Sequence, residues 1–529
     1  MKTRFSFLWL VILACQVLVA QTHIKVKDPS TWTTDELTPY VNQEVIFDAP
    51  IYVTSNASSG SYIVSTRRLF TPTNQVLPKF TNTKATQAYN AFVSMNAAGA
   101  ITLTNVSAYH RCGEKIDNLH AKVLSKNELR FISGKWDSEY NTRAYWDTVN
   151  VRRLVNIDGC DTCLLVCTAN LENYFINDNN HANHRAKVID ALTHIEADLF
   201  GFVEIECGDA AVKEIVTYLN NKFSPRRKYA YVADGTSASG TDTKAAFIYD
   251  SKLLKPYGEL QVIGTGVGKA RKEMQVFEQK SNGERFIYSV NHFKAKTSGG
   301  TGKDADQKDG QGNYNAARCE EAQAVLDLYV RISPQLQEKD ILIMGDLNSY
   351  AKEDPIRKFL DYGLIDLHRA FHADASYSYQ YDHLAGYLDH AICSESLRPQ
   401  VCGAIGFHCN SDEQRGKKTA DQTMFRYSDH DPVLVGLRLD KSATYDPQPL
   451  INNLEVLRGN ANKLIIRDAL TAGGQDSYYG IYDVSGRPIV SATRIESSAE
   501  EVELPTAAGV YILYVYFETR VYPYKFIVP

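Results

Sequence analysis

The stretch Asp340-Ile-Leu-Ile-Met-Gly-Asp-Leu-Asn348 decides the fold of this 529-residue chain. A short apolar run that is rich in isoleucine and ends at a glycine is typical of a buried strand. Polar side chains follow at once, at the end of the strand, where a loop presents them to a cleft. Because side chains alternate along an extended segment, residues two apart point to the same side. We therefore expect Asp346 and Asn348 to face one site.

Outward from this stretch, apolar runs alternate with helical patterns. Strands are predicted at 164–166, 199–203, 286–290 and 433–435, and apolar residues recur at helical spacing over 184–197 and 316–330. Strands with helices between them predict an α/β domain. The polar motifs that follow apolar runs are Thr168-Ala-Asn170-Leu-Glu172, Val203-Glu204-Ile-Glu206, Val290-Asn-His292-Phe-Lys294, Leu388-Asp389-His390 and Ser428-Asp429-His430. Each motif alone is more often a turn or a helix cap, so only the ordered set carries weight.

The ordered set resembles the endonuclease/exonuclease/phosphatase superfamily, with its early Asn, Glu and His, its GD-x-N motif, its late Asp and its terminal SDH. Four stretches are similar to a branch of secreted bacterial extracellular nucleases: residues 290–296, 309–312, 345–356 and 385–391. The resemblance implies a four-layer α+β sandwich over residues 159–442. It also implies a metal-dependent phosphoric ester hydrolase, most closely a nuclease that acts on DNA or RNA.

Phosphodiester hydrolysis explains these residue types, because a hard cation with oxygen ligands offsets the charge of the phosphate and of the leaving alkoxide. The resemblance implies Mg²⁺, with Mn²⁺ or Ca²⁺ as alternatives. Its expected ligands are Asn170, Glu204 and Asp429, and the family pattern favours the first two over Glu172 and Glu206.

The expected catalytic residues are His292, Asp346, Asn348, Asp389 and His430. The resemblance makes Asp389 the carboxylate that bonds to His430 and fixes its tautomer. Which of His292, Asp346 and His430 is the general base stays open. Lys294 and Arg318 are candidate phosphate contacts, with solvated surface charge as an equal alternative.

The N-terminus predicts export. A short basic flank at Lys2 and Arg4 precedes an apolar core too short to span a bilayer, so residues 1–20 are typical of a signal peptide cleaved near Ala20. Lipidation at Cys15 is an alternative. We expect a secreted or cell-surface protein without a stable membrane span. A net charge of -5 argues against a protein that coats nucleic acid through bulk positive charge.

Two further domains are expected. Short alternating runs predict a small all-β domain over residues 21–158; its position resembles the OB-fold modules ahead of extracellular nucleases, although a purely structural role is as compatible. Residues 443–529 predict a C-terminal antiparallel β-sandwich. That segment resembles sorting domains of the type IX secretion system, which implies the secretion machinery as a partner.

Nine cysteines remain after signal cleavage, and in an exported protein they favour disulfides over a metal site. Cys160 with Cys163, and Cys402 with Cys409, are the plausible local pairs.

Two other functions compete with a nuclease. One is a phosphatase or phospholipase-like hydrolase of small phosphoesters, with the same chemistry. The other is an inactive binding or adhesion protein on the same fold; the full acid and base complement argues against it.

Overall fold

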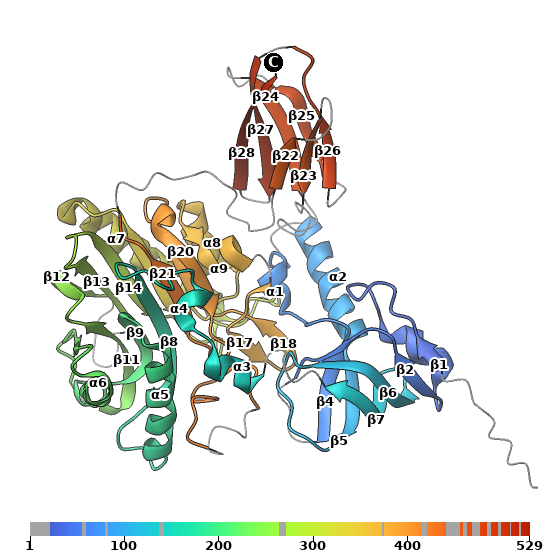
Figure 1. Cartoon of the computed structure of the whole chain (residues 1–529), viewed down its shortest axis with the longest axis horizontal. Coiled ribbons are helices and arrows are strands. Elements are labelled where there is room, and N and C mark those ends of the chain that lie inside the picture. The colour runs from blue at the N-terminus through green and yellow to red at the C-terminus, as the bar shows by residue number, and fades with distance from the viewer. Residues whose placement is uncertain are drawn as a thin grey trace, which may run out of the picture.

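The computed structural model describes residues 22–55, 60–79, 83–136, 142–237, 239–263, 271–372, 375–414, 421–440, 455–458, 463–467, 477–483, 488–495, 499–507, 509–517 and 520–528. The predicted signal peptide and the alternative lipidation at Cys15 lie outside these residues. Three β-rich units follow one another along the chain (Figure 1). Among the residues that the structure describes, no helix is long and apolar enough to cross a membrane.

The N-terminal unit is a curved sheet with helices. Its strands are β1 (Thr22–Ile24), β2 (Glu44–Phe47), β3 (Ile51–Val53), β4 (Gly60–Ser65), β5 (Ile101–Val106), β6 (Lys115–Ser125) and β7 (Glu128–Trp136). They run in the order β1-β2-β6-β3-β4-β5-β7, and an additional β6–β7 pairing closes five of them into a ring. Alternate strand residues such as Phe47 and Tyr62 point inward and form one apolar core together with Trp32, which precedes η1.

The N-terminal unit is not all-β, which corrects the sequence prediction. It also contains the 3-10 helix η1 (Thr34–Tyr40) and the helices α1 (Pro72–Gln75) and α2 (Thr83–Gly99). The residues of α2 are mostly small or polar, so no apolar stripe marked it as a helix.

The central unit contains two six-stranded sheets. One has the order β10-β11-β9-β8-β21-β20 and the other the order β12-β13-β14-β15-β19-β16. The strands of the first are β8 (Leu164–Tyr174), β9 (Leu199–Cys207), β10 (Tyr229–Tyr231), β11 (Ser239–Asp250), β20 (Val401–Gly406) and β21 (Val433–Leu437). Those of the second are β12 (Leu254–Val262), β13 (Lys272–Gln279), β14 (Arg285–His292), β15 (Ile341–Asp346), β16 (Ile365–Asp366) and β19 (Asp389–Cys393).

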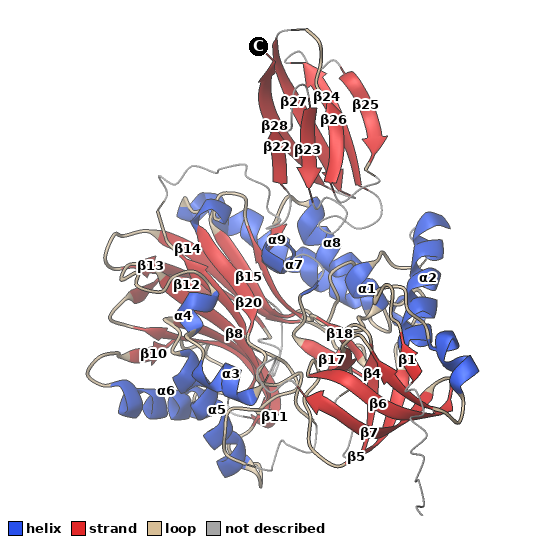
Figure 2. Ribbon diagram, turned by 45° about the vertical axis from the view of Figure 1, so that its right-hand side comes forward, coloured by secondary structure: helices blue, strands red, loops and turns tan. Residues whose placement is uncertain are grey.

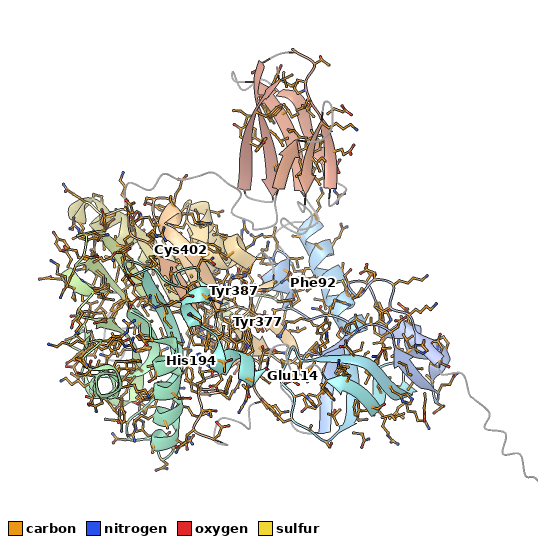
Figure 3. The ribbon with its side chains drawn as sticks, viewed as in Figure 1. Phe92, Glu114, His194, Tyr377, Tyr387 and Cys402 are labelled. Carbon is orange, nitrogen blue, oxygen red and sulfur yellow. A yellow bond between two sulfur atoms is a disulfide. The ribbon has the colours of Figure 1, made fainter. Side chains whose placement is uncertain are left out.

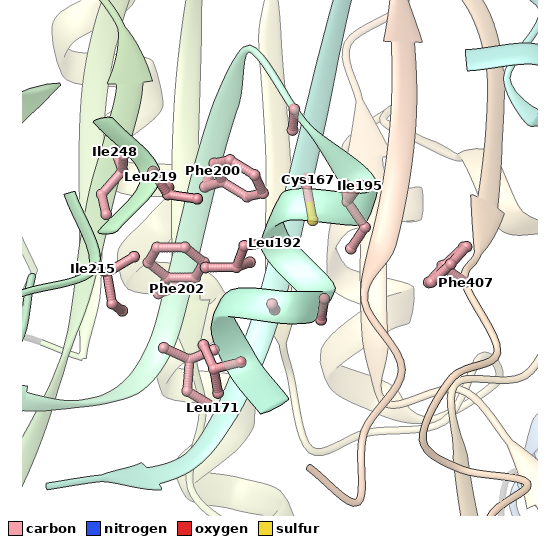
Figure 4. Packing of buried hydrophobic residues seen from close by; sticks show 14 of the residues in the cluster. Cys167, Leu171, Leu192, Ile195, Phe200, Phe202, Ile215, Leu219, Ile248 and Phe407 are labelled. Atoms are coloured by element: carbon pink, nitrogen blue, oxygen red, sulfur yellow. The ribbon is translucent and has the colours of Figure 1, made fainter. Parts of the chain in front are cut away.

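Helices cover the outer faces of both sheets, which gives the expected four layers (Figure 2). The helices α5 (His181–Ile195) and α6 (Ala210–Phe223) contribute to the core on the first sheet, where Phe200 and Phe202 lie beside Leu192 (Figure 4). The helices α7 (Asn315–Leu336) and α8 (Asp354–Asp361) contribute to a second core on the other sheet. A third apolar cluster, with residues from both sheets, joins them. The predicted strands and helices of this unit therefore form a sandwich.

Short elements complete the central unit. They are the helices α3 (Arg143–Thr148), α4 (Val151–Leu154) and α9 (Leu367–His372), the 3-10 helices η2 (Gly302–Asp304) and η4 (Arg398–Gln400), and the hairpin of β17 (Tyr379–Tyr381) and β18 (Leu384–Gly386). Trp146 and Val151 belong to the core of the first sheet. Helices α3 and α4, inside the range expected for the first domain, thus pack with the central unit.

The C-terminal unit is built of two antiparallel sheets that share an apolar core. Its strands are β22 (Glu455–Arg458), β23 (Lys463–Arg467), β24 (Ser477–Asp483), β25 (Pro488–Arg494), β26 (Ala499–Glu503), β27 (Gly509–Phe517) and β28 (Arg520–Val528). Alternating apolar residues such as Ile481, Leu513 and Val515 fill the space between the sheets.

The cysteines follow the sequence expectation only in part. Cys160 and Cys163 form a disulfide. Cys402 and Cys409 are both free thiols, which corrects the second suggested pair. Cys409 is completely buried among apolar side chains, and burial raises the pKa of its thiol well above the ordinary value.

Candidate active site

The predicted polar residues meet at one edge of the two central sheets. Strands β8 and β9 are parallel and place Asn170 and Glu204 at that edge, and the parallel pair β14–β15 aligns His292 with Asp346. The antiparallel strand β19 begins at this edge, so Asp389 is directly opposite Asp346. His430 lies three positions before the first residue of β21, which is antiparallel to β8. Sheet topology therefore gathers residues that are up to 260 positions apart in the sequence.

Asn170 bridges the two sheets. Its amide Nδ2 donates to Glu204 Oε1 at 3.0 Å and to Asp346 Oδ2 at 3.2 Å, while its Oδ1 accepts the Glu172 N–H at 2.8 Å. Glu204 has a φ of 59°, a conformation that costs energy in a residue other than glycine. The strand thus turns its carboxylate toward the facing sheet.

His292 faces both carboxylates. Its Nε2 lies 3.6 Å from Glu204 Oε1 and 3.7 Å from Asp346 Oδ2, and its side chain is 8% exposed. Burial lowers the pKa of His292 to about 4, against the opposing effect of Asp346. At neutral pH this imidazole is uncharged.

His430 and Asp389 form the tightest pair of the site. The Nδ1 of His430 is 2.7 Å from Asp389 Oδ2, and the same oxygen accepts the Ser378 hydroxyl at 2.7 Å. The Nε2 of His430 is left to face Asp346 Oδ2 at 3.7 Å. Burial disfavours a charged imidazole, but Asp389 and Asp346 outweigh it and raise the pKa of His430 well above the ordinary value. Burial in turn raises the pKa of Asp346, although both histidines oppose it.

The Gly345-Asp346-Leu347-Asn348 motif forms a tight turn instead of the continued extended segment that the sequence suggested. Strand β15 ends at Asp346, and Asn348 adopts a φ of 48°, with its N–H donating to Asp346 Oδ1 at 2.9 Å. Its Nδ2 donates to the Phe293 carbonyl at 3.0 Å. Gly345 has a φ of 122°, and a Cβ there would lie 2.1 Å from the Asn291 carbonyl oxygen. Close approach of β14 to β15 therefore requires glycine before Asp346.

Three expected residues lie differently. Asp429 is half-buried beside His430. In the described part of the chain, two groups of carboxylates and histidines could hold a metal ion, and Asp429 belongs to neither of them. Arg318 is completely buried, and its guanidinium donates to Ser349 Oγ and to the carbonyls of residues 294, 311 and 313. Those donors hold the loop that precedes α7, so the contacts of this guanidinium are with the protein itself. Lys294 is exposed, with its Nζ 4.7 Å from the centre of the Tyr314 ring.

The chemistry of the site suits a divalent cation. Two overlapping groups, Glu204 with His292 and Asp346, and Asp346 with Asp389 and His430, each have ligand atoms within 4.8 Å of one another. The carboxylates of Glu204, Asp346 and Asp389 thus converge at one edge of the sheets, where burial and, to a smaller extent, the charge of Asp389 raise the pKa of Asp346. Carboxylate oxygens are the ligands that hard cations prefer.

Several residues of the site carried no sequence signal. Ser378 supports Asp389 but lies in a Tyr377-Ser-Tyr-Gln380 stretch without a motif. The ring of Tyr379 lies 4.6 Å from that of His430, tilted by 31°. Tyr350 is buried within electrostatic reach of Asp346. The GD-x-N motif was the nearest indication of Tyr350, which follows it by two positions.

Comparison with known proteins identifies the class to which this fold and site belong. The model of the Endonuclease/Exonuclease/phosphatase family matches residues 156–430, more than half of the chain, so the chain belongs to that family. Its members are phosphoester hydrolases. A search of curated proteins found no match.

Three solved structures are among those that match about half of this chain. A Bacteroides thetaiotaomicron endonuclease/exonuclease/phosphatase family protein is 17% identical, with 52% of this chain and 97% of that chain covered, at a TM-score of 0.38. A mannosyl-6-phosphatase of Bacteroides thetaiotaomicron is 18% identical over 51% and 98%, at a TM-score of 0.38. The human Nocturnin catalytic domain with bound sulfate is 12% identical over 52% and 94%, at a TM-score of 0.37.

Proposed function

We propose that this chain is a secreted nuclease that hydrolyses DNA or RNA with the help of a divalent cation, for which Mg²⁺ is the first choice. The observation that carries the hydrolytic chemistry is the His430–Asp389 pair at 2.7 Å facing Asp346 and the Asn170–Glu204 pair across the same edge. A phosphate placed between them meets a proton acceptor, a charged donor and a cation site at once.

The pKa shifts suggest separate roles for His292, Asp346 and His430, the three candidates for the general base. Asp346 accepts the proton of the attacking water, because burial has raised its pKa toward the working range of a base. His430 holds a proton on Nε2 and stabilises the negative phosphate oxygens or protonates the leaving alkoxide. His292, with a pKa of about 4, has no second proton to give at neutral pH and is assigned to phosphate contact.

A divalent cation, when bound, supplies charge compensation for the phosphate oxygens and the leaving group. Glu204 would hold it through its carboxylate and Asn170 through the second lone pair of its amide oxygen. Asp429 is kept as a residue that orients water near this position, since it lies outside the two clusters.

Nucleic acid as the substrate rests on the motifs shared with secreted nucleases and on the N-terminal unit. We infer an OB-fold there, because strands β3, β4, β5, β7 and β6 close into a five-strand ring in which β5 and β7 are parallel. Tyr381 supports a stacking role near the site: it is 63% exposed and lies two positions from Tyr379 on β17, on the same face of the strand.

Export is proposed from residues 1–20 and from the resemblance of the C-terminal unit to sorting domains. The disulfide at Cys160–Cys163 suits an oxidising compartment.

The function is tested with the purified full chain, Mg²⁺ or Mn²⁺, and a substrate panel of supercoiled plasmid, linear duplex, single-stranded DNA, RNA, a nitrophenyl phosphodiester and a sugar phosphate. We expect cleavage of at least one nucleic acid, loss of cleavage with excess chelator, and loss in His430→Ala and Asp346→Asn. His120→Ala is the matched control, because His120 pairs with Glu44 in the N-terminal unit.

Other outcomes assign other functions. Release of phosphate from the sugar phosphate with all nucleic acids intact would replace the nuclease by a phosphatase. Hydrolysis of nothing in the panel would favour a binding or adhesion protein.

A further inference from the structure

The N-terminal unit inserts one segment against the catalytic edge. The backbone of Leu69 to Thr71 pairs with strand β18: the Ala385 N–H donates to the Leu69 carbonyl at 2.9 Å, and the Thr71 N–H donates to the Ala385 carbonyl at 2.8 Å. This segment thus lies along the β17–β18 hairpin, whose first residue, Tyr379, forms a bridge with His430.

Arg68 directly precedes this segment, and its side chain points into the central unit. Its Nη1 lies 2.9 Å from Asp412 Oδ1, and its guanidinium carbon lies 4.1 Å from the centre of the Tyr377 ring. Asp412 is completely buried, and the Tyr377 hydroxyl donates to its other oxygen at 2.7 Å. Figure 3 shows Tyr377 where the N-terminal unit meets the central sheets. The Arg68 side chain is only 18% exposed, so this ion pair is largely shielded from solvent.

Two short connections lead from Tyr377 to the catalytic pair. Its chain neighbour Ser378 donates to Asp389 Oδ2 at 2.7 Å and accepts the Asp431 N–H through its carbonyl at 2.8 Å. The Tyr377 ring also stacks on His408 at 3.8 Å and 1°.

His408 continues the second connection. The Nδ1 of His408 is 2.9 Å from Asp431 Oδ2. Asp431 directly follows His430 in the chain. Asp431 Oδ1 accepts the N–H groups of Asn410 and Ser411 at 2.8 and 2.9 Å, and Asn410 donates to the His430 carbonyl at 2.7 Å. The loop that contains Asp412 is therefore the loop that holds the His430 backbone.

We propose that Arg68 is a positioning residue for the His430–Asp389 pair, which makes the N-terminal unit a part of the catalytic centre. The Arg68 guanidinium fixes Asp412 and Tyr377, and these fix the loop and the hairpin on which His430 and Asp389 depend. The hydrogen-bonding groups in this path are largely buried and packed, so each has few alternative arrangements. The catalytic consequence rests on the proposed hydrolase function.

A matched control lies one position earlier. Arg67 donates to the carbonyls of Pro29, Trp32 and Met95, all within the N-terminal unit. Arg67→Met removes an arginine of similar exposure from the same segment without touching the central unit. Arg68→Met with Asp412→Asn removes the ion pair without leaving a buried unpaired carboxylate, and Arg68→Lys retains the charge.

The experiment measures two properties of the full-length variants: steady-state hydrolysis of the substrate cleaved by the wild type, and amide hydrogen exchange by mass spectrometry. For the Arg68→Met/Asp412→Asn variant we expect kcat to fall about 10- to 100-fold, with KM within about threefold, because a small displacement of a catalytic group has this effect. We expect exchange in residues 375–389 and 421–431 to rise at least about tenfold, and that of residues 164–174 to stay unchanged. Arg68→Lys should recover part of kcat.

Equal effects of the Arg67 and Arg68 variants on kcat and on exchange would overturn the proposal, as would unchanged exchange in residues 375–389. If the wild type hydrolyses nothing, the proposed function fails, while the exchange comparison still decides whether Arg68 holds this loop and hairpin. If the double variant does not fold, Tyr377→Phe, which removes only the hydroxyl bonded to Asp412, is subject to the same two criteria.

Discussion

Replacing Asp389 by Asn isolates the charge that acts on His430. A single oxygen of Asp389, Oδ2, accepts both the Ser378 hydroxyl and His430 Nδ1, each at 2.7 Å. The amide oxygen of an asparagine fits the same place and can accept both bonds, so the geometry is retained and the negative charge is lost. Asp389 is 1% exposed, and solvent therefore does not replace that charge.

The magnitude follows from the charge-assisted bond. A hydrogen bond to a charged group contributes roughly 1.5–3 kcal/mol, and at about 1.36 kcal/mol per tenfold this predicts a fall in kcat of roughly 10- to 150-fold. KM should change little, because Asp389 acts on the substrate only through His430. Hydrolysis of plasmid and of the nitrophenyl phosphodiester measures both constants.

The same variant should change the pH dependence of stability. Asp389 and Asp346 overcome burial to raise the pKa of His430, so the stabilisation is complete below the unfolded pKa of about 6.5 and is lost as pH rises through the folded pKa. The difference in unfolding free energy between wild type and Asp389→Asn should therefore be largest near pH ~6 and smaller in alkali. Urea denaturation across pH measures it. Wild-type kcat in the variant, or a difference in unfolding free energy that does not change with pH, would refute the reasoning.

Three further predictions follow from the same geometry. Gly345→Ala should lower the thermal midpoint and kcat together, because its Cβ would lie 2.1 Å from the Asn291 carbonyl oxygen at a φ of 122°; calorimetry that finds an unchanged midpoint contradicts this. Tyr381→Ala should raise KM for single-stranded DNA by about 5- to 100-fold, the value of one stacked base, and leave KM for the nitrophenyl ester unchanged; an equal change for both rules out stacking. In the metal-free protein the imidazole of His292 should titrate near pH 4 by NMR, and a midpoint above 6 would remove the assignment of a neutral imidazole.

The sequence predicts the central fold well because several strands of the central unit are recognisable from short runs of consecutive residues. The runs at 199–203, 286–290 and 433–435 are mostly apolar, as expected for strands covered on both faces, and each lies within a strand of the structure. Helix α5 was equally visible, since Val188, Leu192 and Ile195 recur at helical spacing and are all buried. Helix α2 was missed because its composition, with many alanine, asparagine and threonine residues, contains no amphipathic pattern.

The candidate site is predictable only where its residues form part of a motif. In the sequence, an apolar run is followed by Asn170, Glu204, His292 and Asp346, begins next to Asp389, and lies shortly after His430. The structure gathers all six at one edge. The charge of Arg318 made it a candidate phosphate contact, and in the structure its guanidinium bonds to backbone carbonyls that only the folded loop creates. Charge is visible in a sequence, but the partner that neutralises or saturates it is not.

The ion-pair partners of Asp412 and Glu413 lie outside the residues matched by the family model, and the sequence did not predict these contacts either. The family match begins at residue 156, yet Asp412 pairs with Arg68 at 2.9 Å, and Glu413 lies 2.7 Å from Arg111 Nε, across about 300 residues or more. Both carboxylates are completely buried, and removing one partner of a buried pair costs about 3–5 kcal/mol. Two such losses approach the 5–15 kcal/mol that holds a domain folded. A fragment limited to the matched residues should therefore be far less stable than the full chain, and the loop beside His430 should be the first part to lose its order.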